Sequence, residues 1–304
     1  MRVIVTGGAG FVGGAVAAAF LEAGWEVLVA DDLSTGTAER VPAGAEFEQV
    51  DVASPAFSEL VRRYRPDVIS HQAAQASVTR SVADPLDDAR RNVLGTVNVL
   101  RSAAEAGARR VVYASTGGAI YGECSAPAPE ERAPDPSSPY GASKAAGELA
   151  CRAFERSFGL EVTVLRYANV YGPGQRPDLE AGVVAIFAHA MLGGGTATIF
   201  GDGLQTRDFV YVDDVARANV VAAVAPRTGT YNVGTGRSTP VLELFRLLAE
   251  ATGYGGEPVF APARPGELRH SVVDPSKAAR ELGWRPEVTL EEGVRRVVDA
   301  LRAG

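Results

Sequence analysis

Apolar residues in the first half of the chain form short uninterrupted runs that alternate with longer stretches of helical period. Helices are predicted at 12–23, 55–64, 85–106 and 143–158. The apolar runs lie at 3–5, 27–29, 67–69, 111–113 and 162–165, with a weaker strand at 46–50. Strands that are apolar throughout and alternate with helices are typical of a parallel sheet covered on both faces. The pattern predicts a doubly wound α/β fold (Rossmann), whose ligands bind at the carboxyl ends of the strands.

After Leu165 the pattern loosens, and glycine-rich segments interrupt short strands and helices. Helices are predicted there at 183–192, 213–224, 240–252, 276–282 and 290–302. We expect a first domain over residues 1–167, to which 209–235 returns, and a smaller mixed α/β lobe over 168–304.

Composition narrows the class of protein. The 304 residues include 30 basic and 37 acidic side chains, and this net charge of −7 argues against a nucleic-acid binder or a protein of anionic membranes. The two cysteines and three histidines have no metal-like spacing, so no metal is expected and a reduced, cytoplasmic setting is favoured. The start MRVIVTGG does not resemble a signal peptide, and no apolar run approaches the roughly 20 residues of a membrane span.

A glycine loop between the first strand and the first helix predicts a dinucleotide site. In VIVTGGAGFVG, Gly7 allows a tight turn, Gly10 lets the backbone approach a pyrophosphate, and Gly13 lets the helix pack on the sheet. Asp31 follows Gly10 by 21 residues, where a carboxylate can accept the hydroxyls of the adenosine ribose. No Arg or Lys occurs in 31–36, which disfavours a 2′-phosphate and favours NAD over NADP.

A tyrosine and a lysine one helical turn apart predict an acid–base pair. Tyr140 and Lys144 share one face of a helix. A free tyrosine has a pKa of about 10. A nearby ammonium and the positive nicotinamide ring would stabilise the phenolate, so that Tyr140 can act as a base. YxxxK alone also arises on ordinary amphipathic helices, but here it follows a dinucleotide loop and a strand that ends in Ser115-Thr116.

With these motifs the chain resembles the extended short-chain dehydrogenases/reductases, in the group of nucleotide-sugar epimerases and dehydratases. The resemblance covers essentially the whole chain and rests on TGGAGFVG, HQAAQASV at 71–78, YGASK, RYANVYGPGQ at 166–175, IFGDGLQTRDFVYVDDV at 199–215 and RPGELRHS at 264–271.

The resemblance implies NAD as cofactor and a UDP-sugar as substrate. It implies a cofactor site made of Gly7, Gly10, Phe11 and Val12 at the pyrophosphate, Asp31, Asp32, Ser34 and Gly36 near the ribose, Asp51 and Val52 at the adenine, Ala73, Ala74, Gln75 and Asn92 in mid-cleft, and Tyr140, Lys144, Tyr167 and Val170 near the nicotinamide. It implies a substrate site made of Thr116, Gly117, Tyr140 and Ser271 near the sugar and Asn169, Phe200, Arg207, Arg264 and Glu267 near the nucleotide. The two arginines could instead form surface ion pairs, and Phe200 could equally be a core residue.

The loop after the catalytic strand separates the reactions of the group. A 4,6-dehydratase of this family carries Asp-Glu after its active-site Thr, whereas Gly117, Gly118 and Ala119 follow Thr116 here. The resemblance therefore favours NAD-dependent 4-epimerisation of UDP-glucose and UDP-galactose, by transient oxidation to a 4-keto sugar, rotation and hydride return. Ser271 stands where some members carry a bulky Tyr, so UDP-GlcNAc and UDP-GalNAc are also expected substrates. The alternatives are a UDP-glucuronate 4-epimerase, a 4,6-dehydratase and, disfavoured by YxxxK, a non-enzymatic NAD-sensing scaffold.

Two expectations concern the proton path and the partner. Counted back from Tyr121-Gly122, the family's catalytic Ser or Thr falls on Gly117. We therefore expect Thr116 or Ser115 to replace it, or Tyr140 to act directly. The resemblance also implies a homodimer held by a four-helix bundle of the YxxxK helix and the long helix before it.

Overall fold

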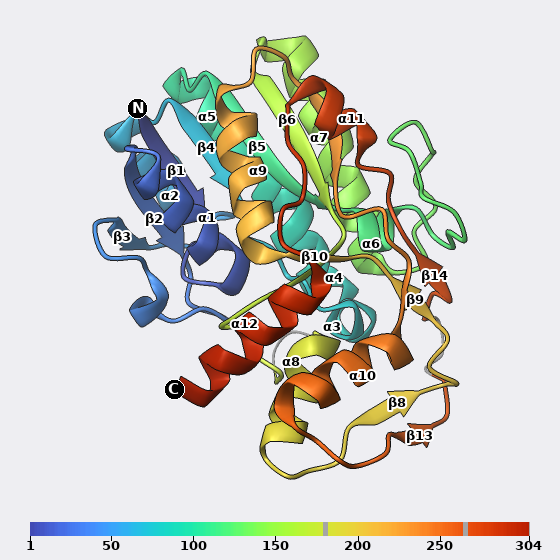
Figure 1. The fold of residues 1–304 in the computed structure, drawn as a ribbon. Coiled ribbons are helices and arrows are strands. Elements are labelled where there is room, and N and C mark those ends of the chain that lie inside the picture. The colour runs from blue at the N-terminus through green and yellow to red at the C-terminus, as the bar shows by residue number, and fades with distance from the viewer. Residues whose placement is uncertain (179–181, 264–266, 304) are drawn as a thin grey trace.

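The computed structural model describes residues 1–178, 182–263 and 267–303, and its centre is a seven-stranded sheet (Figure 1). The strands, in the spatial order β11-β6-β5-β4-β1-β2-β3, all pair in parallel. They are β1 (Arg2–Thr6), β2 (Glu26–Asp31), β3 (Glu46–Gln49), β4 (Val68–His71), β5 (Arg110–Thr116), β6 (Glu161–Tyr167) and β11 (Gly229–Val233). The predicted doubly wound sheet is confirmed.

Helices cover both faces of the sheet because its strands are apolar on both sides. Helices α1 (Phe11–Glu22) and α9 (Val212–Val224) pack together on one face. Helices α2 (Pro55–Tyr64), α5 (Gly95–Ala106) and α7 (Pro139–Phe158) cover the other. Each face of the sheet has its own hydrophobic core, and strand β1 contributes side chains to both. Val3 and Val5 belong to the first core and Ile4 to the second, because adjacent residues of a strand point to opposite faces.

A smaller lobe lies below the carboxyl ends of the strands in Figure 1. It has a core of its own, in which α8 (Val183–Leu192), α10 (Val241–Thr252) and α12 (Leu290–Ala303) pack together. The remaining strands are short: β7 (Asn169–Tyr171), β8 (Thr198–Phe200), β9 (Thr206–Arg207), β12 (Thr239–Pro240), β13 (Val259–Ala261) and β14 (His270–Ser271) belong to this lobe, and β10 (Phe209–Tyr211), which pairs with β7, lies in the segment 209–235. Strand β11 of the central sheet and helix α9 that covers it both come from the segment 209–235. We therefore propose that the first domain consists of residues 1–167 and 209–235, and that the remaining residues after 167 form the small lobe.

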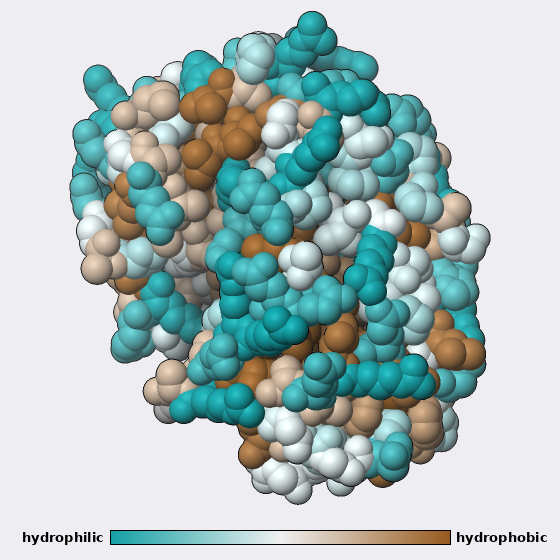
Figure 2. All heavy atoms as spheres, in the orientation of Figure 1, coloured by the Kyte–Doolittle hydropathy of each residue, from teal (hydrophilic) through white to brown (hydrophobic). Residues whose placement is uncertain are grey.

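The surface seen from the side of α9 and α12 is mostly hydrophilic. Polar side chains are spread over both lobes, and apolar ones form separate small patches (Figure 2). Within the described ranges, no helix combines the length and the apolar character that a membrane crossing requires.

Two of the predicted helices differ from the structure by more than one residue at an end or by a break in the helix, and both differences affect residues of the site. The helix predicted at 85–106 consists of α4 (Pro85–Ala89), a π-helical turn η2 (Arg90–Leu94) and α5. The helix predicted from 143 begins at Pro139, because Pro fits the first helical turn and the Ser138 hydroxyl accepts the Gly141 N–H at 3.2 Å. Tyr140 therefore lies in the first turn of α7. The remaining helical segments are η1 (Ala38–Arg40), α3 (Val78–Ala83), α6 (Gly117–Ile120) and α11 (Ser276–Glu281).

A buried ion pair fastens α7 to the sheet. Arg166 on β6 donates from Nε and Nη2 to the two carboxylate oxygens of Glu148, at 2.8 and 2.6 Å. The two side chains are 1% and 3% exposed. The same guanidinium donates to the Tyr121 hydroxyl at 2.7 Å. A charge pair in this position stabilises the fold only while both partners are present.

Replacing one partner of this pair should therefore lower the free energy of unfolding far more than replacing both. We expect Arg166→Met to lower the free energy of unfolding by about 3–5 kcal/mol, because it leaves the Glu148 carboxylate buried without a counter-charge. The double variant Arg166→Met/Glu148→Leu should recover most of this loss in urea denaturation. Arg101→Met, in an exposed pair with Glu105, is the control and should cost less than about 1 kcal/mol. Equal losses in the single and double variants would contradict the expectation.

Candidate active site

Two adjoining cavities, of about 390 and 340 Å³, lie at the carboxyl ends of the strands. The first is lined by the glycine loop and the ends of β2 and β4, and the second by the ends of β5 and β6 with the start of α7. Both are lined by Phe11, Val12, Gln72, Ala74 and Ala76, so they form one continuous cleft. This is the place at which ligands bind in doubly wound folds.

The glycine loop has the geometry of a phosphate cradle. Gly7 has a φ of +70°, and a Cβ there would lie 2.7 Å from the Ala73 nitrogen. A Cβ on Gly13 would lie 2.0 Å from the Gly7 carbonyl oxygen. Gly10 begins α1 without a side-chain cap, which leaves the N–H groups of the first helical turn for a ligand. The residues present therefore fit the pyrophosphate of a dinucleotide.

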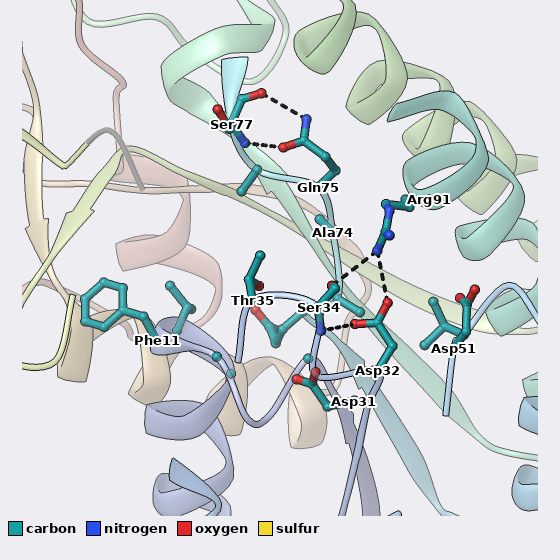
Figure 3. A pocket seen from close by; sticks show the side chains of 18 of the residues that line it. Phe11, Asp31, Asp32, Ser34, Thr35, Asp51, Ala74, Gln75, Ser77 and Arg91 are labelled. Atoms are coloured by element: carbon teal, nitrogen blue, oxygen red, sulfur yellow. Dashed lines mark hydrogen bonds and ion pairs between the residues drawn. The ribbon is translucent and has the colours of Figure 1, made fainter. Parts of the chain in front are cut away.

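The adenosine end is built around Asp31, the last residue of β2 (Figure 3). Its carboxylate accepts the N–H groups of Ala9 and Leu33, at 3.0 and 2.8 Å, and so ties the β2 loop to the glycine loop. Burial raises the pKa of Asp31. Of the residues expected at this end and in mid-cleft, the cavity is lined by Asp31, Asp32, Ser34, Asp51, Val52, Ala73, Ala74 and Gln75. Gly36 lies behind the lining, where a Cβ would come within 2.5 Å of the Ala9 carbonyl oxygen.

Asn92 supports the cleft from behind and does not line either cavity. Its Oδ1 accepts the Gln75 N–H at 2.8 Å, and its Nδ2 donates to the Ser143 hydroxyl at 3.1 Å. The same Nδ2 donates to the buried carboxylate of Asp88 at 3.1 Å. Asn92 thus couples the mid-cleft loop to α7. The sequence analysis missed Asp88, because nothing in its local pattern distinguishes it from the exposed Asp84 or the half-buried Asp87 on the same turn.

Tyr140 and Lys144 line the second cavity, with Thr116, Tyr167, Asn169 and Val170. Burial raises the pKa of Tyr140 to about 12, while the hydrogen bond with the Thr116 side chain lowers it and the Asp88 carboxylate raises it. Burial lowers the pKa of Lys144 to about 8, and Cys151, Glu148 and Asp88 act in the opposite direction. The Lys144 ammonium lies 4.5 Å above the centre of the Tyr113 ring.

The two hydroxyls at the end of β5 have different partners. Ser115 donates to Glu148 Oε1 at 2.6 Å, so its hydroxyl joins the buried ion pair. Thr116 lines the same cavity as Tyr140, and its side chain lowers the pKa of the Tyr140 hydroxyl. The position expected to carry a hydroxyl, Gly117, has no room for one, because a Cβ there would lie 2.6 Å from Val273 Cγ1.

The residues expected at the nucleotide of the substrate come from the small lobe. Arg207 on β9 donates to Glu267 at 3.0 Å, which brings these two together. Asn169 Oδ1 is buried without a hydrogen-bond partner beside Gly118, as expected of a group that receives a ligand. Ser271 is buried and donates to the Gly118 carbonyl oxygen at 3.4 Å. Phe200 ends β8, and Arg264 lies outside the described residues.

His71 is a buried, neutral histidine close to Lys144. His71, at the end of β4, bonds to the hydroxyls of Thr6 and Thr96, at 2.8 and 3.2 Å. Burial lowers the pKa of His71 to about 3, and the charge of Lys144 lowers it further. Since the folded pKa is below the unfolded value, the stability that this group confers is complete above about pH 6.5 and is lost as the pH falls.

We therefore expect stability to fall on acidification partly through His71. Between pH 6.5 and 5 this group alone should remove about 2 kcal/mol from the free energy of unfolding. His71→Asn should show a shallower decrease over the same range, measured by urea denaturation at each pH. The exposed His189 is the control, and His189→Asn should follow the wild type. A His71→Asn variant as pH-dependent as the wild type would contradict the expectation.

Comparison with known proteins agrees with this geometry over the whole chain. Residues 3–234 match the NAD dependent epimerase/dehydratase family. The UDP-glucose 4-epimerase of Mycolicibacterium smegmatis is 44% identical over 310 residues, 99% of each chain. The solved UDP-glucose 4-epimerase of Thermotoga maritima, with UDP-glucose, has a TM-score of 0.97 at 46% identity over 100% of this chain and 99% of its own. That of Thermus thermophilus, in complex with NAD, has a TM-score of 0.95 at 46% identity over 100% of both chains. Together with the cleft described above, these matches show that the chain belongs to the NAD dependent epimerase/dehydratase family.

Proposed function

We propose that this protein is an NAD-dependent 4-epimerase of UDP-sugars, with UDP-glucose and UDP-galactose as its principal pair. The observation that carries the proposal is the second cavity, where Thr116, Tyr140 and Lys144 meet beside the dinucleotide cleft. Among the described residues, no aspartate or glutamate lines this cavity. Elimination of water needs an additional acid–base pair, whereas oxidation and reduction at one carbon do not. The names of the similar solved structures, both UDP-glucose 4-epimerases, support the same reaction.

Tyr140 is the group that takes and returns the proton of the sugar's 4-hydroxyl. The chemistry that bound NAD supplies is acceptance of hydride from carbon 4 and its return to the opposite face of the ring. Lys144, on the same face of α7, contributes a positive charge that favours the phenolate of Tyr140. The Thr116 hydroxyl, in the same cavity as Tyr140, offers a proton path between the phenol and the sugar. Ser115, engaged by Glu148, is less suited to this role.

The small lobe supplies the groups for the nucleotide and the sugar. Arg207 can donate two parallel hydrogen bonds to a phosphate and contacts Glu267, while Asn169 lines the second cavity. Ser271 is smaller than the Tyr that some family members carry at this position, so we propose that UDP-GlcNAc and UDP-GalNAc are also converted. UDP-glucuronate is kept as an alternative substrate, because part of the segment expected near carbon 6, including Glu180, lies outside the described residues.

The reaction is tested by incubating the purified protein with UDP-glucose, UDP-GlcNAc and UDP-glucuronate and identifying the products by NMR. We expect inversion at carbon 4 for the first two sugars. A 4-keto-6-deoxy product would instead indicate a dehydratase. No turnover of UDP-GlcNAc beside fast turnover of UDP-galactose would refute the argument from Ser271.

The proton path is tested in the same assay with single variants. Tyr140→Phe and Thr116→Ala should each lower turnover by about 10²–10⁴, the usual contribution of a positioned acid–base group, with UDP binding preserved in calorimetry. Ser115→Ala should be milder, because its hydroxyl bonds to Glu148. Full activity of Thr116→Ala would exclude the relay and leave direct transfer to Tyr140.

We also propose a homodimer, formed by the helices α5 and α7. These helices contact each other, and exposed apolar side chains lie on α7 (Leu149, 64% exposed) and at the end of η2 directly before α5 (Leu94, 61%). Leu86 on α4 and Val97 on α5 extend the same stripe, at 82% and 37%. A stripe of this kind on two adjacent helices matches the isologous interface of a two-fold dimer, in which each copy contributes both helices.

Light scattering after size exclusion should therefore give twice the chain mass of 31.7 kDa at micromolar concentration. Leu94→Glu/Leu149→Glu should shift the protein to the monomer mass, because it buries four charges at the interface. Val224→Glu, which changes an exposed apolar residue at the end of α9, is the matched control and should stay dimeric. A monomeric wild type would refute the proposal.

We propose the cytoplasm as the place of action. Cys124 and Cys151 are both free and buried, which agrees with a reducing compartment.

A further inference from the structure

An arginine that the sequence does not place near the ribose lies beside it in the structure. The preference for NAD was predicted from the absence of basic residues in 31–36. The π-helical turn η2 nevertheless brings Arg91 into the lining of the adenosine cavity, next to Asp32 and Ser34 (Figure 3). Absence of a cation is therefore not the reason for that preference.

The guanidinium of Arg91 is held on two sides by carboxylates. Its Nη1 donates to Asp32 Oδ2 at 3.0 Å and to the Ser34 hydroxyl at 3.2 Å. Its Nε donates to both oxygens of Asp87, each at 3.0 Å. Arg91, Asp32 and Asp87 are 22%, 29% and 20% exposed, so water screens these ion pairs only in part. One positive charge is thus shared between two negative ones.

This arrangement determines whether the cavity attracts or repels a 2′-phosphate on the ribose. Asp31 and Asp32 both line the cavity at the end of β2, and each would repel it. Arg91 could attract it only by giving up Asp32. Without these two carboxylates, the Nη1 of Arg91 would be free to donate to phosphate oxygens, for which a guanidinium is well suited.

We propose that Asp32, by pairing with Arg91, masks a latent site for the 2′-phosphate of NADP, and that the Asp32–Arg91 pair sets cofactor choice together with Asp31. The proposal concerns the adenosine end of the cleft. It holds whatever sugar the second cavity takes, and it does not depend on the proposed 4-epimerase activity.

The test is direct binding of nucleotides to variants of the full chain. The probes are 5′-ADP and 2′,5′-ADP, titrated into protein freed of endogenous nucleotide, and the cofactor that copurifies with each variant is identified after acid release. The variants are Asp31→Ser/Asp32→Ser, the same pair with Arg91→Ala, and, as matched control, the same pair with Arg101→Ala on the exposed side of α5. Thermal unfolding followed by circular dichroism verifies that each variant is folded.

We expect the wild type to prefer 5′-ADP and the double variant to gain affinity for 2′,5′-ADP. Adding Arg91→Ala should cancel about ten- to a hundredfold of that gain, the value of a hydrogen bond between charged groups, when affinity for 2′,5′-ADP is expressed relative to affinity for 5′-ADP. Arg101→Ala should cancel none of it. Equal binding of 2′,5′-ADP with and without Arg91, or no gain in the double variant, would overturn the proposal.

A second variant guards against a folding defect. Asp31 also holds the loop through Ala9 and Leu33, so Asp31→Ser can weaken the site for structural reasons. Asp32→Ser alone keeps those hydrogen bonds and still releases Arg91. It should raise affinity for 2′,5′-ADP by a smaller factor that again disappears with Arg91→Ala, and a gain that survives Arg91→Ala would count against the pair.

Discussion

The buried ion pair between Arg166 and Glu148 is the interaction on which the active site depends. Glu148 follows Lys144 by one helical turn, and Lys144 follows Tyr140 by one turn, so Glu148 and the two proposed catalytic side chains share one face of α7. Two charged hydrogen bonds at 2.8 and 2.6 Å therefore fix the rotation of the helix about its axis as well as its distance from the sheet. Because the same guanidinium also bonds to Tyr121, one cation positions the catalytic helix and the segment that follows β5. The catalytic geometry is thus built into the core.

Ser115 and Thr116 both line the second cavity, and their contacts distinguish them. Adjacent residues of a strand point to opposite faces, so the two hydroxyls have different neighbours. Ser115 is taken by the Glu148 carboxylate, and Thr116 meets Tyr140. Val273, from the small lobe, occupies the space that a side chain at Gly117 would need. The missing hydroxyl at position 117 and the role proposed for Thr116 therefore both follow from the packing around the end of β5.

Much of the fold could be predicted from local patterns, because apolar runs and their helical spacing report burial directly. The paired spacing of Tyr140 and Lys144 was enough to predict that they lie together. The local pattern could not predict that Arg91 lies at the adenosine cavity. Its partner Asp32 is 59 residues away, and Arg91 belongs to a π-helical turn that the spacing of apolar residues does not reveal. The choice between Ser115 and Thr116 likewise needed the position of Glu148, which tertiary packing decides. Distant pairing and helix irregularity are the features that a single sequence leaves open.

Cofactor recognition in this protein depends on which arginine side chains at the adenosine end are already paired with carboxylates. Among the described residues, five carboxylates and three guanidinium groups line or flank the adenosine end: Asp31, Asp32, Asp51, Asp87 and Asp178, with Arg80, Arg90 and Arg91. Each arginine is engaged by an aspartate, so the basic side chains near the ribose add almost no net positive field. The N-terminus of α1 carries roughly half a positive charge, which would stabilise the pyrophosphate. It would contribute little to binding a 2′-phosphate on the ribose. A ribose hydroxyl, in contrast, can donate to Asp31 without disturbing any pair. Discrimination therefore depends on the carboxylates that occupy the arginines, and counting basic residues along the sequence does not reveal it.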